Sequence, residues 1–188
     1  MKIRIGFPFC VTAFILISCG MRESFLCAFF ISLLHETGHL IAMILLGIRP
    51  VSIHFTPTGI RINCPRDLIS CRAECIISAS GPLVNLVLMP ILYFCDDIPF
   101  FINLSLLIIN LLPLKSLDAG RFLYNSVIIL KDESAALKIM NITETAVCIM
   151  LVFLLIVTLC FNIINVSFIV FTVMVVITAV SDIVMSRY

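Results

Sequence analysis

The segment Leu33-Leu34-His35-Glu36-Thr37-Gly38-His39-Leu40 places an HExxH motif inside a run of apolar residues. On a helix, His35 and His39 are four residues apart, so both imidazoles project from one face, one turn apart. Imidazole nitrogens bind zinc readily, and Glu36 beside them has the chemistry of a general base. Burying these groups in a membrane segment is costly. This cost favours a functional site over two histidines that are merely held by interhelical hydrogen bonds.

Composition indicates a polytopic membrane protein with a single membrane domain, residues 1–188. The chain is 62% hydrophobic and 12% charged, with a mean hydropathy of +1.22, whereas soluble domains are roughly half apolar and about a quarter charged. A net charge of +1 gives no reason to expect a nucleic-acid partner. The cysteines are scattered, and only Cys71 and Cys75 lie close together, so we interpret them as reduced, buried thiols.

The apolar runs predict an all-α fold with six transmembrane helices embedded in the lipid bilayer. The predicted helices cover residues 3–20, 25–47, 76–94, 100–130, 145–161 and 166–184. A polar connection is expected between residue 131 and about residue 144. The first run also has the features of a signal peptide, so cleavage of residues 1–19 stays open. A first membrane helix is the preferred interpretation because the chain continues directly into further apolar runs.

A small β-hairpin is predicted over residues 50–63, followed by a short interfacial helix over 65–75. Val51, Ile53 and Phe55 alternate with polar residues, and a Pro/Gly turn signal follows. An edge of the hairpin would either pair with an extended substrate or only cover the membrane surface. His54 is a candidate fourth, inhibitory ligand, although a solvated strand residue is the better interpretation because no partner lies at ligand spacing.

The fourth helix is predicted to be broken around Pro113, which removes a backbone donor and disfavours helix at Leu112. Irregular backbone at membrane depth is tolerated where it lines a site. Zinc in catalytic sites usually has three protein ligands, so a third ligand is needed besides the two histidines. The candidates are Asp118, Glu144 and Asp182. Arg121 lies one turn after Asp118, so a plain ion pair between them is an alternative.

Charge asymmetry predicts the orientation in the membrane. With the N-terminus in the cytosol, the inner segments carry nearly all the basic residues and the outer connections carry only Arg22. This bias follows the positive-inside rule. We therefore expect both termini and the hairpin at the cytosolic face.

Three motifs, taken together, resemble the site-2 protease family of intramembrane zinc metalloproteases. They are His35–His39, then Gly81-Pro82-Leu83-Val84-Asn85, then Asn110-Leu111-Leu112-Pro113 leading into Leu117-Asp118-Ala119-Gly120. They cover the second to fourth predicted helices, which form the catalytic core in that family. The short chain resembles the bacterial sporulation-type branch, which processes a membrane-associated pro-sigma factor. That branch usually carries a C-terminal CBS domain, which we do not find here, and there is no PDZ insertion.

The resemblance implies that His35, His39 and Asp118 bind one Zn²⁺ per chain and that Glu36 activates water. Asn110 matches the family asparagine eight residues before the ligand aspartate. Its implied role is to hold the substrate or to stabilise the oxyanion. On this basis we expect cleavage of a peptide bond in or near the membrane segment of a protein substrate.

Asn85 matches the asparagine of the third-helix motif and is grouped with Asn110 as a candidate substrate or oxyanion residue. Two positions depart from the family pattern, because many relatives have Gly at Ala119 and Leu at Thr37. Ala119 adds a methyl group next to a ligand. Thr37 is expected to lie away from the histidine face. Neither departure removes a ligand.

The resemblance further implies a bacterial cell-membrane protein whose substrate is a membrane protein, such as a membrane-associated transcription-factor precursor. A homo-oligomer and a regulatory membrane partner stay open. The alternative functions are a metal transporter and a non-catalytic metal-binding scaffold. A transporter should carry several ionisable residues along a pathway, whereas here they gather in the second to fourth helices.

Overall fold

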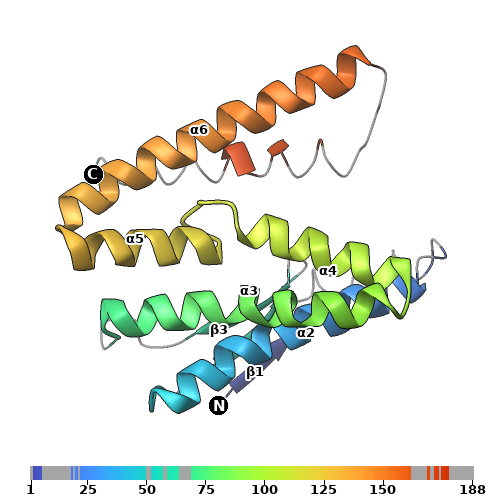
Figure 1. Cartoon of the computed structure of the whole chain (residues 1–188), viewed down its shortest axis with the longest axis horizontal. Helices are drawn as coiled ribbons and strands as arrows, with labels where there is room; N and C mark the ends of the chain where they lie inside the picture. Colours follow the sequence, from blue (N-terminus) through green and yellow to red (C-terminus); the bar gives the residue numbers. More distant parts are fainter. Residues whose placement is uncertain are drawn as a thin grey trace. The chain divides into compact units, whose positions relative to one another are not determined.

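The computed structural model describes residues 2–5, 18, 20, 22–49, 52–56, 59–63, 69–161, 169, 172–173 and 175–177. Most of these residues are helical, and three short segments form one small sheet. The chain divides into two compact units, Met1–Leu111 and Leu112–Tyr188 (Figure 1). The histidine motif belongs to the first unit and Asp118 to the second.

Three helices form most of the first unit. They are α2 (Arg22–Leu45), α3 (Cys71–Tyr93) and α4 (Asp97–Asn110), and each packs against the other two (Figure 1). Ala42 and Met43 of α2 are buried against Ile77 of α3. This contact brings the histidine face of α2 against the middle of α3.

The end of α2 is fixed by Gly47, whose φ of 72° is a left-handed conformation that favours glycine. The Gly47 N–H bonds to the carbonyl oxygen of Ile44 at 3.0 Å, and the Ile48 N–H bonds to that of Met43 at 2.8 Å. This pair of bonds is the Schellman motif, which satisfies carbonyls at a helix end. The helix therefore ends at Leu45, nearly two turns after His39.

Helix α3 begins five residues before the predicted start at residue 76, at Cys71. Ser70 is its N-cap, and the Ser70 hydroxyl accepts a hydrogen bond from the Ala73 N–H at 3.3 Å. Glu74 lies in the first turn, where the helix dipole favours a negative charge. The polar residues from 71 to 75 therefore open α3, and the separate interfacial helix expected over 65–75 is wrong for this part.

The sheet has the order β1–β2–β3, formed by Lys2–Ile5, Ser52–Thr56 and Gly59–Asn63. Strand β2 pairs antiparallel with β3 and parallel with β1, with Ile3 opposite Ile53 and Ile53 opposite Ile62. Residues 3–5 are therefore extended, which corrects the start of the helix predicted from residue 3. Because β2 is the central strand, its backbone groups are used on both sides. An added peptide would have to pair with β1 or β3 instead.

The second unit contains α5 (Asp118–Leu130) and α6 (Glu133–Cys160), which pack against each other. The α6 helix begins twelve residues before the predicted start at residue 145, within the expected polar connection. Asp132 is the cap, and its carboxylate accepts a hydrogen bond from the Ala135 N–H at 2.7 Å. This bond, aided by one from the Ser134 hydroxyl, lowers the pKa of Asp132.

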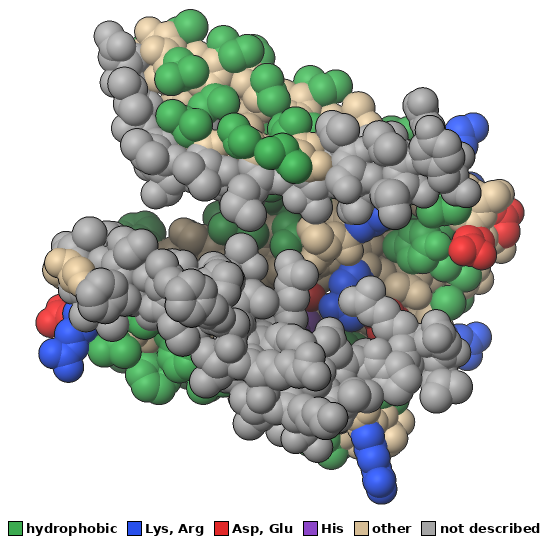
Figure 2. Space-filling view, turned by 180° about the vertical axis from the view of Figure 1, so that it is seen from behind, with side chains coloured by type: hydrophobic (Ala, Val, Ile, Leu, Met, Phe, Trp, Pro, Cys, Tyr) green, Lys and Arg blue, Asp and Glu red, His purple; other side chains and the backbone are tan. Residues whose placement is uncertain are grey.

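The early start of α6 follows from its pattern of buried residues. Ala136, Met140, Glu144, Val147 and Leu151 recur at intervals of three or four and form one buried stripe. The outer surface of α6 is covered by apolar side chains (Figure 2). An apolar outer surface is typical of a helix in lipid rather than in water.

Within the described residues, three helices are long and apolar enough to cross a membrane: α2, α3 and α6. Helix α4 is apolar but shorter, and the chain leaves helical structure at Leu111 before α5 begins at Asp118. These helices indicate a membrane protein. Most of the predicted helices 3–20 and 166–184 lies outside the described residues, and the described part of the latter is helical.

Candidate functional site

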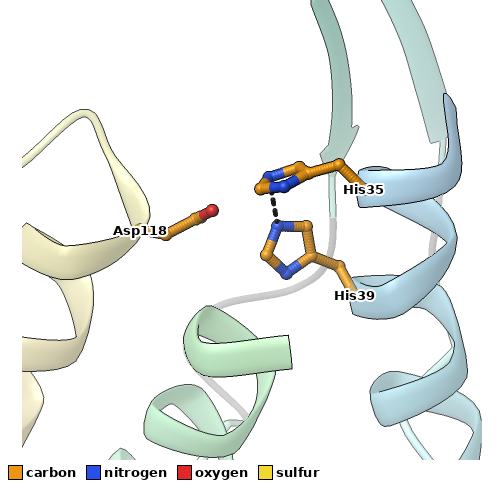
Figure 3. Close-up of side chains that lie close together, drawn as sticks. All are labelled: His35, His39 and Asp118. Carbon is orange, nitrogen blue, oxygen red and sulfur yellow. Dashed lines mark hydrogen bonds between the residues drawn. The ribbon is translucent and has the colours of Figure 1, made fainter. Parts of the chain in front are cut away.

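His35 and His39 lie one turn apart on the buried face of α2, with 4% and 6% of their surfaces exposed. Their rings point to the same side of the helix and meet edge to face, with centroids 4.9 Å apart (Figure 3). The two Nε2 atoms approach each other at 3.2 Å. The α-helical spacing of the motif therefore produces a convergent pair of imidazole nitrogens.

Helix α3 determines which nitrogen of each ring carries the proton. His39 Nδ1 lies 2.7 Å from the backbone carbonyl oxygen of Ile77, and His35 Nδ1 lies 3.3 Å from Asn85 Oδ1. Both oxygens only accept hydrogen bonds, so Nδ1 is the donor in each ring. The Ser80 hydroxyl, which donates to the same Ile77 carbonyl, also lies 3.4 Å from His39 Nδ1. In a neutral imidazole the other nitrogen, Nε2, then carries a lone pair.

Two nitrogen lone pairs facing each other at 3.2 Å repel unless a cation lies between them. A shared proton or a metal ion would supply this charge. With Zn–N distances of about 2.0–2.1 Å, nitrogens separated by 3.2 Å subtend an angle of about 100° at the metal, near the tetrahedral value. An oxygen that accepts a hydrogen bond from the other ring nitrogen is also typical of a metal-binding histidine. The pair therefore fits a divalent metal ion.

Two glycines allow α2 and α3 to approach closely enough for these contacts. A Cβ atom on Gly81 would lie 2.5 Å from His39 Cε1 and 2.7 Å from His35 Cε1. A Cβ on Gly38 would lie 2.7 Å from the Ser80 carbonyl oxygen. Real Cβ atoms do not approach other atoms this closely, so both positions require glycine in this packing. Gly81 thus forms the surface against which the two imidazoles rest.

Asn85 connects the histidine pair to α4. Its side chain is fully buried, and its backbone carbonyl accepts a hydrogen bond from Asn103 Nδ2 at 2.9 Å. Asn103 is also fully buried and was not among the site residues predicted from the sequence. A lone asparagine in an apolar helix has no motif that singles it out. The signal that could have identified Asn103 from the sequence is the cost of burying a polar side chain in a membrane segment.

The other polar candidates of the first unit have different surroundings. Asn110 is the last residue of α4, and its Nδ2 donates to the Leu106 carbonyl oxygen at 3.0 Å within the same helix. Glu36 is half-buried and directly follows His35 on α2. The Thr37 hydroxyl donates to the Leu34 carbonyl oxygen at 2.5 Å. Of the predicted residues, His35, His39 and Asn85 are thus brought together within this unit.

Asp118 is the first residue of α5 in the second unit and is 6% exposed (Figure 3). It lies in the first turn of α5, where the helix dipole is favourable to negative charge. Arg121 Nη1 lies 3.9 Å from Asp118 Oδ1, at the outer limit of an ion pair. The ion pair that the sequence offers as an alternative is therefore present. At this distance the attraction between the two groups is weak.

The turn before Asp118 is closely packed. Leu114 is buried against Val147 and Leu151 of α6, and a Cβ atom on Gly120 would collide with the backbone of Leu114. The Leu117 N–H bonds to the Leu114 carbonyl oxygen at 2.9 Å. These contacts set the direction from which the chain enters α5.

The remaining sequence candidates are Glu144, His54 and Asp182. Glu144 is buried on α6, and its carboxylate accepts a hydrogen bond from the Lys115 N–H. The side chain of His54 and the whole of Asp182 lie outside the described residues.

Comparison with solved structures finds proteins of similar fold. No family model matches the chain, and no curated protein does. Among solved structures, the site-2 protease from Methanocaldococcus jannaschii matches with a TM-score of 0.67, over 96% of this chain and 91% of that one. The chain has the fold of a site-2 protease. At 20% identity the likeness extends to the fold, and the chemistry has to be argued from the residues.

Proposed function

We propose that the protein is an intramembrane zinc metalloprotease of the site-2 protease family. The observation that carries this proposal is the histidine pair, whose Nδ1 atoms contact oxygen acceptors and whose Nε2 atoms converge at 3.2 Å. A site-2 protease fold around this pair adds support. Asp118 is proposed as the third protein ligand. It supplies the carboxylate that completes a donor set of metal-binding type with the two imidazoles.

The residues of the chain have separable roles in this proposal. Zinc, when bound, would activate a water molecule and polarise the peptide carbonyl. Glu36 takes a proton from the water and passes it to the leaving amine. Ile77 and Asn85 orient the two imidazoles through their Nδ1 atoms.

Stabilisation of the oxyanion is assigned to an asparagine amide. Asn110 would have to release its bond to the Leu106 carbonyl before its Nδ2 could donate to substrate. Asn85 Nδ2 has no hydrogen-bond partner among the described residues, so it is a second donor of the same kind. Either amide would act by meeting the negative charge that develops on the peptide oxygen.

The proposed substrate is a membrane protein, such as a membrane-associated transcription-factor precursor. Three apolar helices long enough to span a bilayer support a location in the membrane. We also propose a multi-pass topology with both termini in the cytosol, which the charge pattern of the sequence supports. A bacterial cell membrane is the location that the family resemblance implies. A helical substrate must unwind before cleavage because its carbonyls are bonded within the helix.

Cleavage by the reconstituted protein tests the proposal. The wild type and Glu36→Gln would be placed in liposomes with a panel of single-pass membrane reporters, and the metal content of both would be measured. We expect one metal ion per chain in both proteins and a rate at least about 100-fold lower for Glu36→Gln, as for loss of a general base. Equal cleavage by both proteins would contradict the assigned role of Glu36.

A further inference from the structure

Helix α6 carries a buried carboxylate that no step of the proposed mechanism uses. Glu144 is 1% exposed and lies in the middle of the stripe formed by Ala136, Met140, Val147 and Leu151. The other four members of this stripe are apolar. An acidic residue inside a helix of membrane-spanning length is costly and marks a functional role by default.

The contact made by Glu144 points to that role. Its Oε1 accepts a hydrogen bond from the backbone N–H of Lys115 at 2.7 Å. Lys115 lies in the turn between α4 and α5, three residues before Asp118. The turn follows Pro113 and is not helical, so its amides lack the regular partners that a helix provides. A carboxylate is a strong acceptor for such an amide.

Two apolar contacts hold the same turn from either side of this bond. Leu114 is buried against Val147 and Leu151, which follow Glu144 along the same face of α6. Gly120 of α5 lies against the backbone of Leu114. The Lys115 side chain also reaches α6, with Nζ 3.5 Å from Asn141 Oδ1. The backbone leading into Asp118 is therefore fastened to α6 at successive residues.

We propose that Glu144 is a positioning residue that fixes the turn before Asp118, so that the Asp118 carboxylate is presented in one orientation for metal binding. It acts through the Lys115 amide and α5, not by contact with the metal. This inference rests on the proposed metal site. It predicts that a hydrogen-bond acceptor at the position of Oε1 is needed, whereas the negative charge itself is not.

The proposed role of Glu144 is tested by measuring the metal affinity of the full-length protein in detergent, with Co²⁺ as the probe. Glu144→Leu removes the acceptor and should weaken Co²⁺ binding at least about tenfold, as for loss of support behind a ligand. Glu144→Gln keeps a carbonyl acceptor and should stay within about threefold of the wild type. Glu144→Asp keeps the charge but shortens the side chain, and it should resemble Glu144→Leu. It also replaces Glu144→Leu if that variant does not fold.

Met140→Ala is the matched control, because Met140 is fully buried on the same face of α6 but belongs neither to the cluster around Leu114 nor to the bond with the Lys115 amide. It should lower thermal stability while leaving the Co²⁺ affinity and absorption spectrum unchanged. Wild-type affinity in Glu144→Leu would overturn the inference. Equal losses in Glu144→Gln and Glu144→Leu would overturn it as well, because the carboxylate would then be required as such. Unchanged affinity in Asp118→Ala would instead contradict the proposed metal site.

Discussion

The two parts of the proposed metal site are held by different means. In the first unit, each imidazole of the pair on α2 is oriented by a direct bond from its own side chain to α3. In the second unit, Asp118 is oriented through its backbone, because the turn from Leu112 to Leu117 is packed and bonded against α6. Changes near the histidines should therefore act on the ligand atoms themselves. Changes near Asp118 should act on the path of the chain.

The largest expected effect comes from Gly81→Ala, which adds a methyl group where the two imidazole rings rest. The rings would have to move by about an ångström, and misplacement of this size costs about 100-fold in activity. Metal content and reporter cleavage should both fall. Leu83→Ala is the control, because Leu83 is exposed on the same helix. Normal metal binding in Gly81→Ala would show that the imidazoles are not held against α3 in the active protein.

A smaller effect is expected when only one orienting bond is removed. Asn85→Ala leaves His35 Nδ1 without its acceptor and should weaken metal binding by about 10- to 100-fold. Asn85→Asp keeps an oxygen at the same position and should retain metal binding. Titration with a competing chelator would measure the metal affinity of both variants. Equal losses in the two variants would indicate that the asparagine amide acts on something other than His35.

The smallest effect of the three is expected in the second unit. Gly120→Ala forces the Leu114 backbone to shift, which should lower the free energy of unfolding by about 1–3 kcal/mol. Because the shift acts on the path of the chain, metal affinity should fall by about tenfold at most. Thermal denaturation and chelator competition on one sample separate the two effects. A loss of metal affinity as large as in Gly81→Ala would remove the contrast between the two regions.

The sequence predicts best what depends on local spacing. The spacing of four residues from His35 to His39 suffices to place both imidazoles on one face, and Pro113 suffices to predict a break between Asn110 and Asp118. By contrast, no local pattern predicts that Lys2–Ile5 pairs in parallel with a strand about fifty residues away. The sequence also does not show where α3 and α6 begin. Ser70 and Asp132 are the N-caps of these helices, and the polar residues that follow them belong to the helices and not to the connections.

The supporting residues of the site were harder to predict than the ligands. Ile77 contributes a backbone carbonyl, which leaves no trace in the side chain. Asn103 and Glu144 act through the backbone of Asn85 and Lys115, so their partners depend on tertiary packing. Each is nonetheless a buried polar group in an apolar helix, and that cost is readable from sequence.

The most direct test of the central claim is the metal content of the purified protein beside His35→Ala and His39→Ala. If the two Nε2 atoms converge to hold a metal ion, the wild type should retain one zinc per chain and each variant should lose it while remaining folded. If the wild type binds no divalent metal, or if both variants retain it in full, the histidine pair is not a metal site and the proposed mechanism is wrong.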